Sequence, residues 1–169
     1  GRSGGSAYRK PTASYNTTQP PSPRLSSLRR SAPSREDRAI QLLFNQMSAW
    51  ENMSTTQHQW LCDLPEPHGE AFKWLDQQMQ ENGPMNWSAL FQTLQDHPLQ
   101  DWLAKLVLAA PSDVVFDQDE LNSVLREIEK RQIDKELNDM SDHVAQDPAL
   151  YERYRLLNQR RTELKKAMG

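Results

Sequence analysis

The stretch DQDELNSVLREIEKRQIDKELNDMSDHVAQDP, residues 117–148, decides the fold of this chain. Its apolar residues recur every three or four positions, as one face of a helix requires, until a five-residue step separates Ile128 from Ile133. The two apolar rows are Leu121, Val124, Leu125 and Ile128, followed by Ile133, Leu137, Met140 and Val144. At roughly 100° per residue, the second row is rotated by about 120–150° from the first. One helix therefore packs on two different surfaces, and we expect it to connect a globular body to a helical hairpin.

Both ends of this segment carry helix boundary signals. Asp117 and Glu120 match a D-x-x-E capping box after the apolar Phe116, which predicts that the long helix begins here. Proline restricts the residue before it and suits the first turn of a helix. Asp147-Pro148 therefore predicts the end of the long helix and the start of a second helix.

The final helix is predicted to pack against the long one. Its apolar seam, with spacings of four, three, seven and four, consists of Leu150, Tyr154, Leu157, Leu164 and Met168. Arg161 stands at the position that the seam skips. This pattern predicts an antiparallel coiled-coil hairpin. Because residues 151–169 hold six basic residues and two acidic ones, we expect an exposed basic tip, which could be a contact surface or simply a solvated face.

The segment from Ser34 to Pro111 predicts five short helices. Ser34 and Asp37 form an N-terminal cap signal, and the apolar spacing then continues through Trp50. Breaks fall at Pro65-Glu66-Pro67, Asn82-Gly83-Pro84, Pro98 and Pro111. No stretch alternates apolar and polar residues as a half-buried strand does. We therefore predict an all-α fold, with a helical bundle over residues 35–130 joined by a long helix to a C-terminal two-helix hairpin over residues 131–169.

Charge is strongly segregated along the 169 residues, although the net charge is only −3. Residues 1–35 hold seven basic residues and no acid, residues 36–150 hold 21 acids and seven bases, and residues 151–169 carry a net charge of +4. Rich in Pro, Ser and Thr, residues 1–34 are predicted to be a disordered basic linker. Such a linker could be a solubilising tether or could add weak, salt-sensitive contact with nucleic acid.

Cysteine usage and hydropathy indicate the environment of the chain. Cys62 is the single cysteine, which excludes a disulfide framework or a four-cysteine metal site within these residues and suits a reducing compartment. The sequence has no run of 18 apolar residues and nothing that resembles a signal peptide. We expect a cytoplasmic location and no membrane partner.

The residues that could carry chemistry do not form a recognisable site. His58, Cys62 and His68 are close in sequence, but a zinc site requires four ligands at tighter spacing, so we expect no metal and no cofactor. Phosphate-binding, dinucleotide-binding and nucleophile-elbow motifs are absent from the sequence. The five tryptophans fall mostly on apolar helical rows, which favours core packing over base stacking. We therefore expect no catalytic residues, and a docking module rather than an enzyme.

The order of several segments is informative. AIQLLFNQ at 39–46 is followed by the break at 82–84 before WSALFQ at 87–92, by the helix around Leu103-Ala104, by the long helix and by ELKK at 163–166. Over residues 35–167 this order resembles the C-terminal helicase-binding domain of bacterial DnaG-type DNA primases. The basic linker is similar to the one that this family has after its RNA polymerase domain. The resemblance implies a bundle similar to the N-terminal domain of the replicative helicase, and a hairpin that docks on the hexameric DnaB-type helicase.

The resemblance also implies candidate binding residues. Family contacts with the helicase correspond to Thr162 and Lys166, on a helix that is expected to expose Gln159, Arg160 and Lys165 as well. A protruding amphipathic hairpin with a basic tip suits a groove with an acidic rim.

The same family resemblance implies a site for the acidic C-terminal tail of single-stranded DNA-binding protein. Its basic residues correspond to Arg35 and Arg38 at the start of the first helix, with Lys105 as the lysine on a later helix. Glu36 and Asp37 stand where the family pattern is more basic, so Arg35 and Arg38 could equally be an ordinary exposed helix start.

Two other classes of function remain open at this stage. The chain could be a helical adaptor like the helicase N-terminal domain itself, or a nucleic-acid-binding helical module that acts through its basic ends. Enzymatic activity is implied only for a parent primase, a DNA-directed RNA polymerase whose zinc-binding and catalytic domains lie outside these 169 residues.

Overall fold

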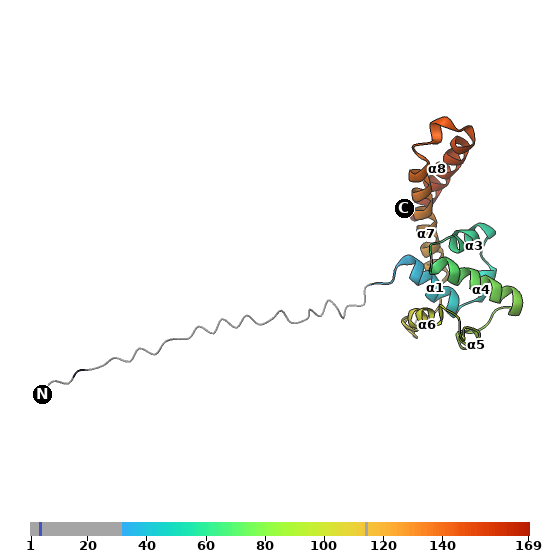
Figure 1. Cartoon of the computed structure of the whole chain (residues 1–169), viewed down its shortest axis with the longest axis vertical. Helices are drawn as coiled ribbons and strands as arrows, with labels where there is room; N and C mark the ends of the chain where they lie inside the picture. Colours follow the sequence, from blue (N-terminus) through green and yellow to red (C-terminus); the bar gives the residue numbers. More distant parts are fainter. Residues whose placement is uncertain (1–3, 5–31, 114) are drawn as a thin grey trace. The chain divides into compact units, whose positions relative to one another are not determined.

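The computed structural model describes Gly4, residues 32–113 and residues 115–169, so almost all of the linker expected over residues 1–34 lies outside the described residues. From Pro33 to Gly169 the chain forms one compact unit. Its elements are α1 (Arg35–Asn45), α2 (Ser48–Glu51), α3 (Thr55–Cys62), α4 (His68–Asn82), α5 (Trp87–Thr93), α6 (Gln100–Leu108), α7 (Gln118–Met140), the short 3-10 helix η2 (Val144–Gln146) and α8 (Pro148–Met168) (Figure 1). None of the described residues is in a strand, and the prediction of an all-α fold is confirmed.

The first helix is shorter than its apolar spacing predicted. α1 ends at Asn45, and Gln46 leaves the helix with φ −132° and ψ 72°. The side-chain amide of Asn45 donates to the main-chain oxygen of Gln41 at 2.9 Å, and that of Gln46 donates to Ser48 Oγ at 2.8 Å. Side-chain hydrogen bonds of this kind compete with helix continuation. The prediction of one helix through Trp50 was therefore wrong, because Ser48–Glu51 form the separate helix α2.

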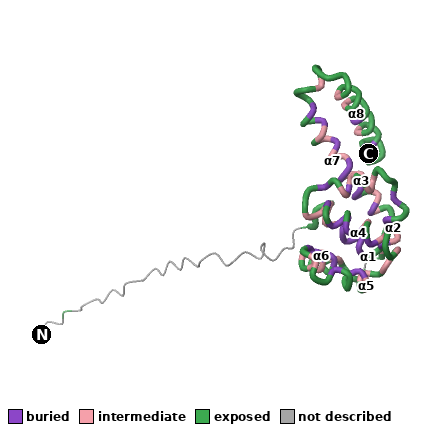
Figure 2. Tube along the Cα trace, turned by 45° about the vertical axis from the view of Figure 1, so that its right-hand side comes forward, coloured by how far each residue is buried: buried purple, intermediate pink, exposed green. Residues whose placement is uncertain are grey.

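The body of the unit, α1 to α6 with the first half of α7, is packed around α1. Every residue from Ala39 to Phe44 is buried, and α4, α6 and α7 all contact this helix (Figure 2). Gln41 is the polar residue in this run. Its Nε2 donates to the main-chain oxygen of Leu106 at 3.0 Å and its Oε1 accepts from Arg38 Nη1 at 3.2 Å, so its burial leaves neither group without a partner. The bond to Leu106 joins α1 to α6.

Several helix ends follow their sequence signals. Ser54 and Gln57 form a capping box at the start of α3, and the Asp147 side chain caps α8 ahead of Pro148. Gly83 ends α4 with φ +73° and ψ −174°, a left-handed conformation that glycine adopts without a Cβ clash.

The start of α7 differs from the expected capping box. Asp117 does cap the helix, because its Oδ1 accepts from the main-chain N of Asp119 at 2.9 Å. Glu120 does not complete the box, since its carboxylate pairs with Arg38 of α1 instead. Instead of a hydrogen bond within α7, Glu120 thus forms a contact between α7 and α1, with a residue 82 positions away in the sequence.

α7 belongs to two hydrophobic cores in succession. Its first apolar row is buried in the core of the body, and Ile133, Leu137 and Met140 of the second row are buried with α8 in a smaller core. That hairpin core consists of Ile133, Leu137, Met140, Leu157 and Leu164. The change falls at the five-residue step between Ile128 and Ile133. α7 ends at Met140, before the predicted stop at Asp147, so Val144 lies in η2 and is only partly buried. Trp60 of α3 packs against the hairpin core from the side of the body.

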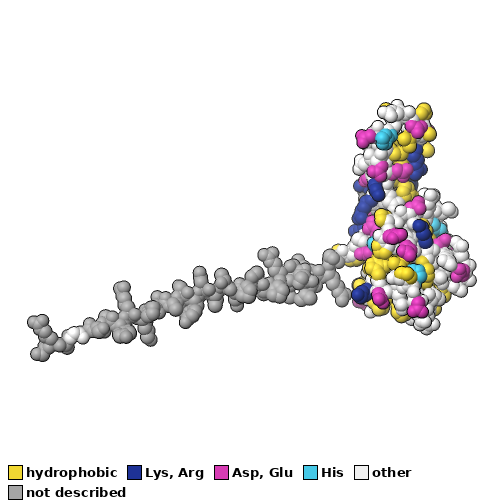
Figure 3. All heavy atoms as spheres, viewed as in Figure 1, with side chains coloured by type: hydrophobic (Ala, Val, Ile, Leu, Met, Phe, Trp, Pro, Cys, Tyr) yellow, Lys and Arg dark blue, Asp and Glu magenta, His cyan; other side chains and the backbone are white. Residues whose placement is uncertain are grey.

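α8 runs antiparallel to α7, so the tip of the hairpin is the turn around η2. Arg153 pairs with Glu136, and Arg160 pairs with Glu129 nearer the body; the C-terminus lies beside α7 (Figure 1). Figure 3 shows acidic side chains and a histidine at the tip, with basic side chains gathered lower down along the hairpin. The expectation of a basic tip was therefore wrong, because antiparallel pairing returns the basic second half of α8 to the base of the hairpin.

Candidate docking surfaces

One side of α8 points away from α7. Leu157 and Leu164 are buried against α7, and at roughly 100° per residue Gln159, Thr162 and Lys166 fall on the opposite side. These three residues are exposed, and their spacing of three and four makes them a continuous row. The structure thus brings together three of the five residues expected to bind a helicase.

Arg160 and Lys165 flank this row on opposite sides. Arg160 donates to the Glu129 carboxylate from Nε at 2.8 Å and from Nη2 at 3.1 Å. Glu129 is only 7% exposed, and burial of an unpaired carboxylate is costly. The hydrogen bonds with Glu129 raise the pKa of Arg160. Although 49% of its side chain is exposed, Arg160 primarily joins the two helices of the hairpin.

Two large side chains on the same side of α8 were missed by sequence reasoning. Tyr151 is 58% exposed and Leu156 is 48% exposed, and they lie on either edge of the row toward the tip. The sequence did contain a signal for the exposure of Leu156. It directly precedes the seam residue Leu157, and neighbouring residues of a helix point in directions roughly 100° apart. We define the outer face of α8 as Tyr151, Leu156, Gln159, Thr162 and Lys166. It combines apolar anchors with polar and basic groups.

The first turn of α1 is tied to α7 by ion pairs. The three pairs are Arg35 with Glu127, Glu36 with Arg131, and Arg38 with Glu120. Arg38 donates to Glu120 from Nε at 2.5 Å and from Nη2 at 2.9 Å, and only 15% of its side chain is exposed. The hydrogen bonds from Arg38 lower the pKa of Glu120. The two arginines expected to bind an acidic tail therefore already have carboxylate partners.

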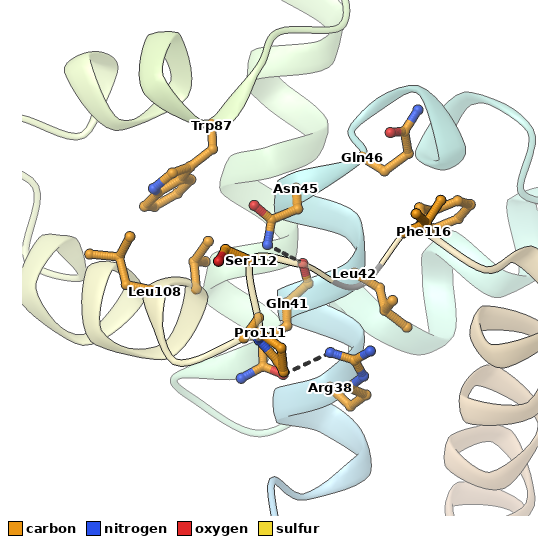
Figure 4. A pocket seen from close by; sticks show the side chains of 13 residues that line it. Arg38, Gln41, Leu42, Asn45, Gln46, Trp87, Leu108, Pro111, Ser112 and Phe116 are labelled. Carbon is orange, nitrogen blue, oxygen red and sulfur yellow. Dashed lines mark hydrogen bonds between the residues drawn. The ribbon is translucent and has the colours of Figure 1, made fainter.

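A groove of about 350 Å³ opens beside Arg38. Its apolar walls include Trp87, Leu108 and Phe116, and the close view shows Arg38 at one end (Figure 4). Lys105 is exposed on α6, but neither Lys105 nor Arg35 is among the described residues that line the groove. The structure thus places one of the three expected tail-binding residues at the groove.

His58, Cys62 and His68 have separate partners. His58 Nε2 lies 2.7 Å from the main-chain oxygen of Trp50, and the two rings stack with centroids 4.3 Å apart. His68 Nε2 lies 2.7 Å from Asp37 Oδ1. Burial raises the pKa of the Cys62 thiol, assisted by neighbouring carboxylates. Within the described ranges, no group of three or more His, Cys, Asp or Glu side chains is arranged to hold a metal ion.

Comparisons of the chain with protein-family models, with curated proteins and with solved structures found no match. Among the described residues, no helix has both the length and the apolar character needed to cross a membrane. The outer face of α8 and the groove beside α1 hold four of the residues that the sequence predicted as binding candidates: Gln159, Thr162, Lys166 and Arg38.

Proposed function

We propose that this chain is the helicase-docking module of a replication primase, and that the outer face of α8 binds the N-terminal domain of a hexameric DnaB-type helicase. The observation that carries the proposal is the presence of two exposed apolar side chains, Tyr151 and Leu156, beside the basic and polar row that ends at Lys166. Protein interfaces commonly centre on such anchors and surround them with a polar rim.

The construction of the hairpin supports this role. Its helices share a core of their own, the Arg160 to Glu129 pair joins them, and Trp60 contacts them from the body. A surface that is already ordered loses less conformational entropy when a partner binds. Lys165 and Lys166 add positive charge, which favours a partner with an acidic rim and accelerates its association.

Charge reversal tests the proposal. The double variant Lys165→Glu and Lys166→Glu should bind the cognate helicase N-terminal domain about tenfold more weakly, or worse, in isothermal titration calorimetry, since like charges then face each other. The matched control is Lys73→Glu with Lys105→Glu, which changes the net charge equally at two exposed sites of the body. The control should bind like wild type. Unchanged helicase affinity in the α8 variant, with helicity retained by circular dichroism, would reject the site.

The groove beside α1 supports a second role. We propose that it binds the acidic C-terminal tail of single-stranded DNA-binding protein, because it combines apolar walls, including Trp87 and Phe116, with the guanidinium of Arg38. An apolar terminal side chain can enter such a groove while carboxylates approach the arginine. Titration with an acidic, phenylalanine-terminated peptide, followed by NMR, tests this role. Chemical shift changes confined to regions away from Arg35, Arg38 and Lys105 would reject it.

In this proposal the chain itself has no catalytic residues and requires no cofactor, and primer synthesis belongs to a parent primase in the bacterial cytoplasm. The competing class is a nucleic-acid-binding module. Its signature would be a salt-dependent affinity for single-stranded DNA in the absence of any helicase binding. Co-purification with the cognate helicase distinguishes these two functions most directly.

A further inference from the structure

Two carboxylates of α7 pair with the two arginines in the first turn of α1. Glu120 and Glu127 are seven residues apart, which is about two helical turns and places them on the same side of α7. Glu120 accepts two hydrogen bonds from Arg38, and Glu127 Oε2 lies 2.6 Å from Arg35 Nε. Arg38 also lines the groove. The carboxylates of the chain itself therefore stand where those of an acidic ligand would bind.

The geometry at Arg38 means that Glu120 competes with an acidic ligand for the guanidinium. A guanidinium binds a carboxylate most strongly through two parallel N–H donors. Nε and Nη2 both donate to Glu120, while Nη1 donates to Gln41 Oε1. A ligand that uses the same edge of Arg38 must displace Glu120, and a ligand that approaches from elsewhere meets a guanidinium whose charge is already balanced.

We infer that Glu120 and Glu127 are internal competitors of an acidic peptide, Glu120 at Arg38, which lines the groove, and Glu127 at Arg35, one helical turn away on α1. An acidic peptide that binds at Arg35 and Arg38 then loosens the contact between α1 and the first turns of α7. The inference rests on the proposed role of the groove as an acidic-peptide site. Leu121 and Val124 remain buried in the core of the body, so the release concerns the ion pairs rather than the whole helix. By linkage, anything that weakens these ion pairs strengthens peptide binding.

Neutral, nearly isosteric substitutions test the inference. Glu120→Gln and Glu127→Gln each remove one internal carboxylate, and each should bind an acidic, phenylalanine-terminated peptide about two- to fivefold more tightly than wild type, as expected for loss of a weak competing ion pair. The matched control is Glu136→Gln, which removes the same charge from α7 and breaks the Arg153 pair in the hairpin. The control should bind the peptide with wild-type affinity.

The outcomes separate this inference from the function on which it rests. If wild type and both variants bind the peptide equally, internal competition is excluded while the groove remains a peptide site. If Glu136→Gln tightens binding as much as Glu120→Gln, the effect is one of net charge and the inference is again overturned. If none of the proteins binds, the proposed role of the groove fails, and the inference fails with it. Peptide addition should also accelerate amide hydrogen exchange in the first turns of wild-type α7, which gives a second readout independent of the variants.

Discussion

Gln132 donates from Nε2 to the main-chain oxygen of Trp60 at 3.0 Å, at the level where α7 leaves the core of the body for that of the hairpin. The indole of Trp60 packs against the hairpin core. The hairpin is thus joined to the body through α3 as well as through the continuous helix α7.

Trp60→Ala should loosen the hairpin while leaving the body folded. Loss of a partly buried indole from the hairpin core is expected to reduce local stability by about 1–3 kcal/mol. Native-state hydrogen exchange measures this as faster exchange in α8 with unchanged protection in α1 and α4. Gln132→Ala removes only the hydrogen bond and should have a smaller effect, about 0.5–1.5 kcal/mol. Equal protection of α8 in Trp60→Ala and wild type would show that α3 does not brace the hairpin.

Two arginines of α8 should differ in their contributions to stability. Arg160→Ala leaves the nearly buried Glu129 carboxylate without its partner, which should cost about 1–3 kcal/mol in urea unfolding. Arg153→Ala breaks a pair whose side chains are 51% and 34% exposed, and such surface pairs contribute less than about 1 kcal/mol. Arg153→Ala is therefore the matched control. Equal losses in the two variants would mean that burial of Glu129 does not decide the effect. Weaker helicase binding by Arg160→Ala would therefore count as loss of a contact only under conditions in which the variant is fully folded.

The Arg38 to Glu120 pair should make the fold sensitive to acid. The pKa of Glu120 is lowered in the folded state from its ordinary value of 4.5, chiefly by hydrogen bonds from Arg38. A lowered pKa means that the stabilisation is fully present above the ordinary value and is lost as the pH falls through the folded-state value. The difference in urea midpoint between wild type and Glu120→Gln should therefore be largest near neutral pH and shrink below about pH 4.5. Arg38→Met should remove the same pH-dependent contribution to stability. Parallel pH profiles of the urea midpoint for all three proteins would show that the Arg38 to Glu120 pair is not its source.

Much of the fold could be predicted from local patterns. The caps at Ser34 and Asp147, the break at Gly83 and the change of face after Ile128 depend on neighbouring residues, and sequence spacing indicates them directly. Glu120 shows where such reasoning fails. Its spacing from Asp117 matches a capping box, but its partner is Arg38, and nothing local indicates a contact between helices so distant in sequence.

The candidate sites were harder to predict than the fold, for the same reason. Arg160 was expected to be exposed, which it is, but residue spacing did not indicate that antiparallel pairing of α8 also places it against Glu129. Lys105 was grouped with Arg38, but it lies outside the set of residues that line the groove. Identification of Leu156 as an exposed anchor required knowing which of two adjacent leucines faces α7. Side-chain partners across helices are set by packing, which residue spacing alone does not specify.

That pair of adjacent leucines gives the sharpest test of the outer face of α8. Leu156 is 48% exposed and Leu157 is 4% exposed, so the same substitution at neighbouring positions separates binding from folding. Leu157→Ala should lower hairpin stability by about 2–4 kcal/mol, because it opens a cavity in the hairpin core. Leu156→Ala should change stability by less than about 0.5 kcal/mol but weaken helicase binding by about tenfold, the loss typical of an anchor residue. Calorimetric titration with the helicase N-terminal domain, alongside urea unfolding, measures both effects. If a fully folded Leu156→Ala variant binds the helicase with wild-type affinity, the outer face of α8 is not the docking surface.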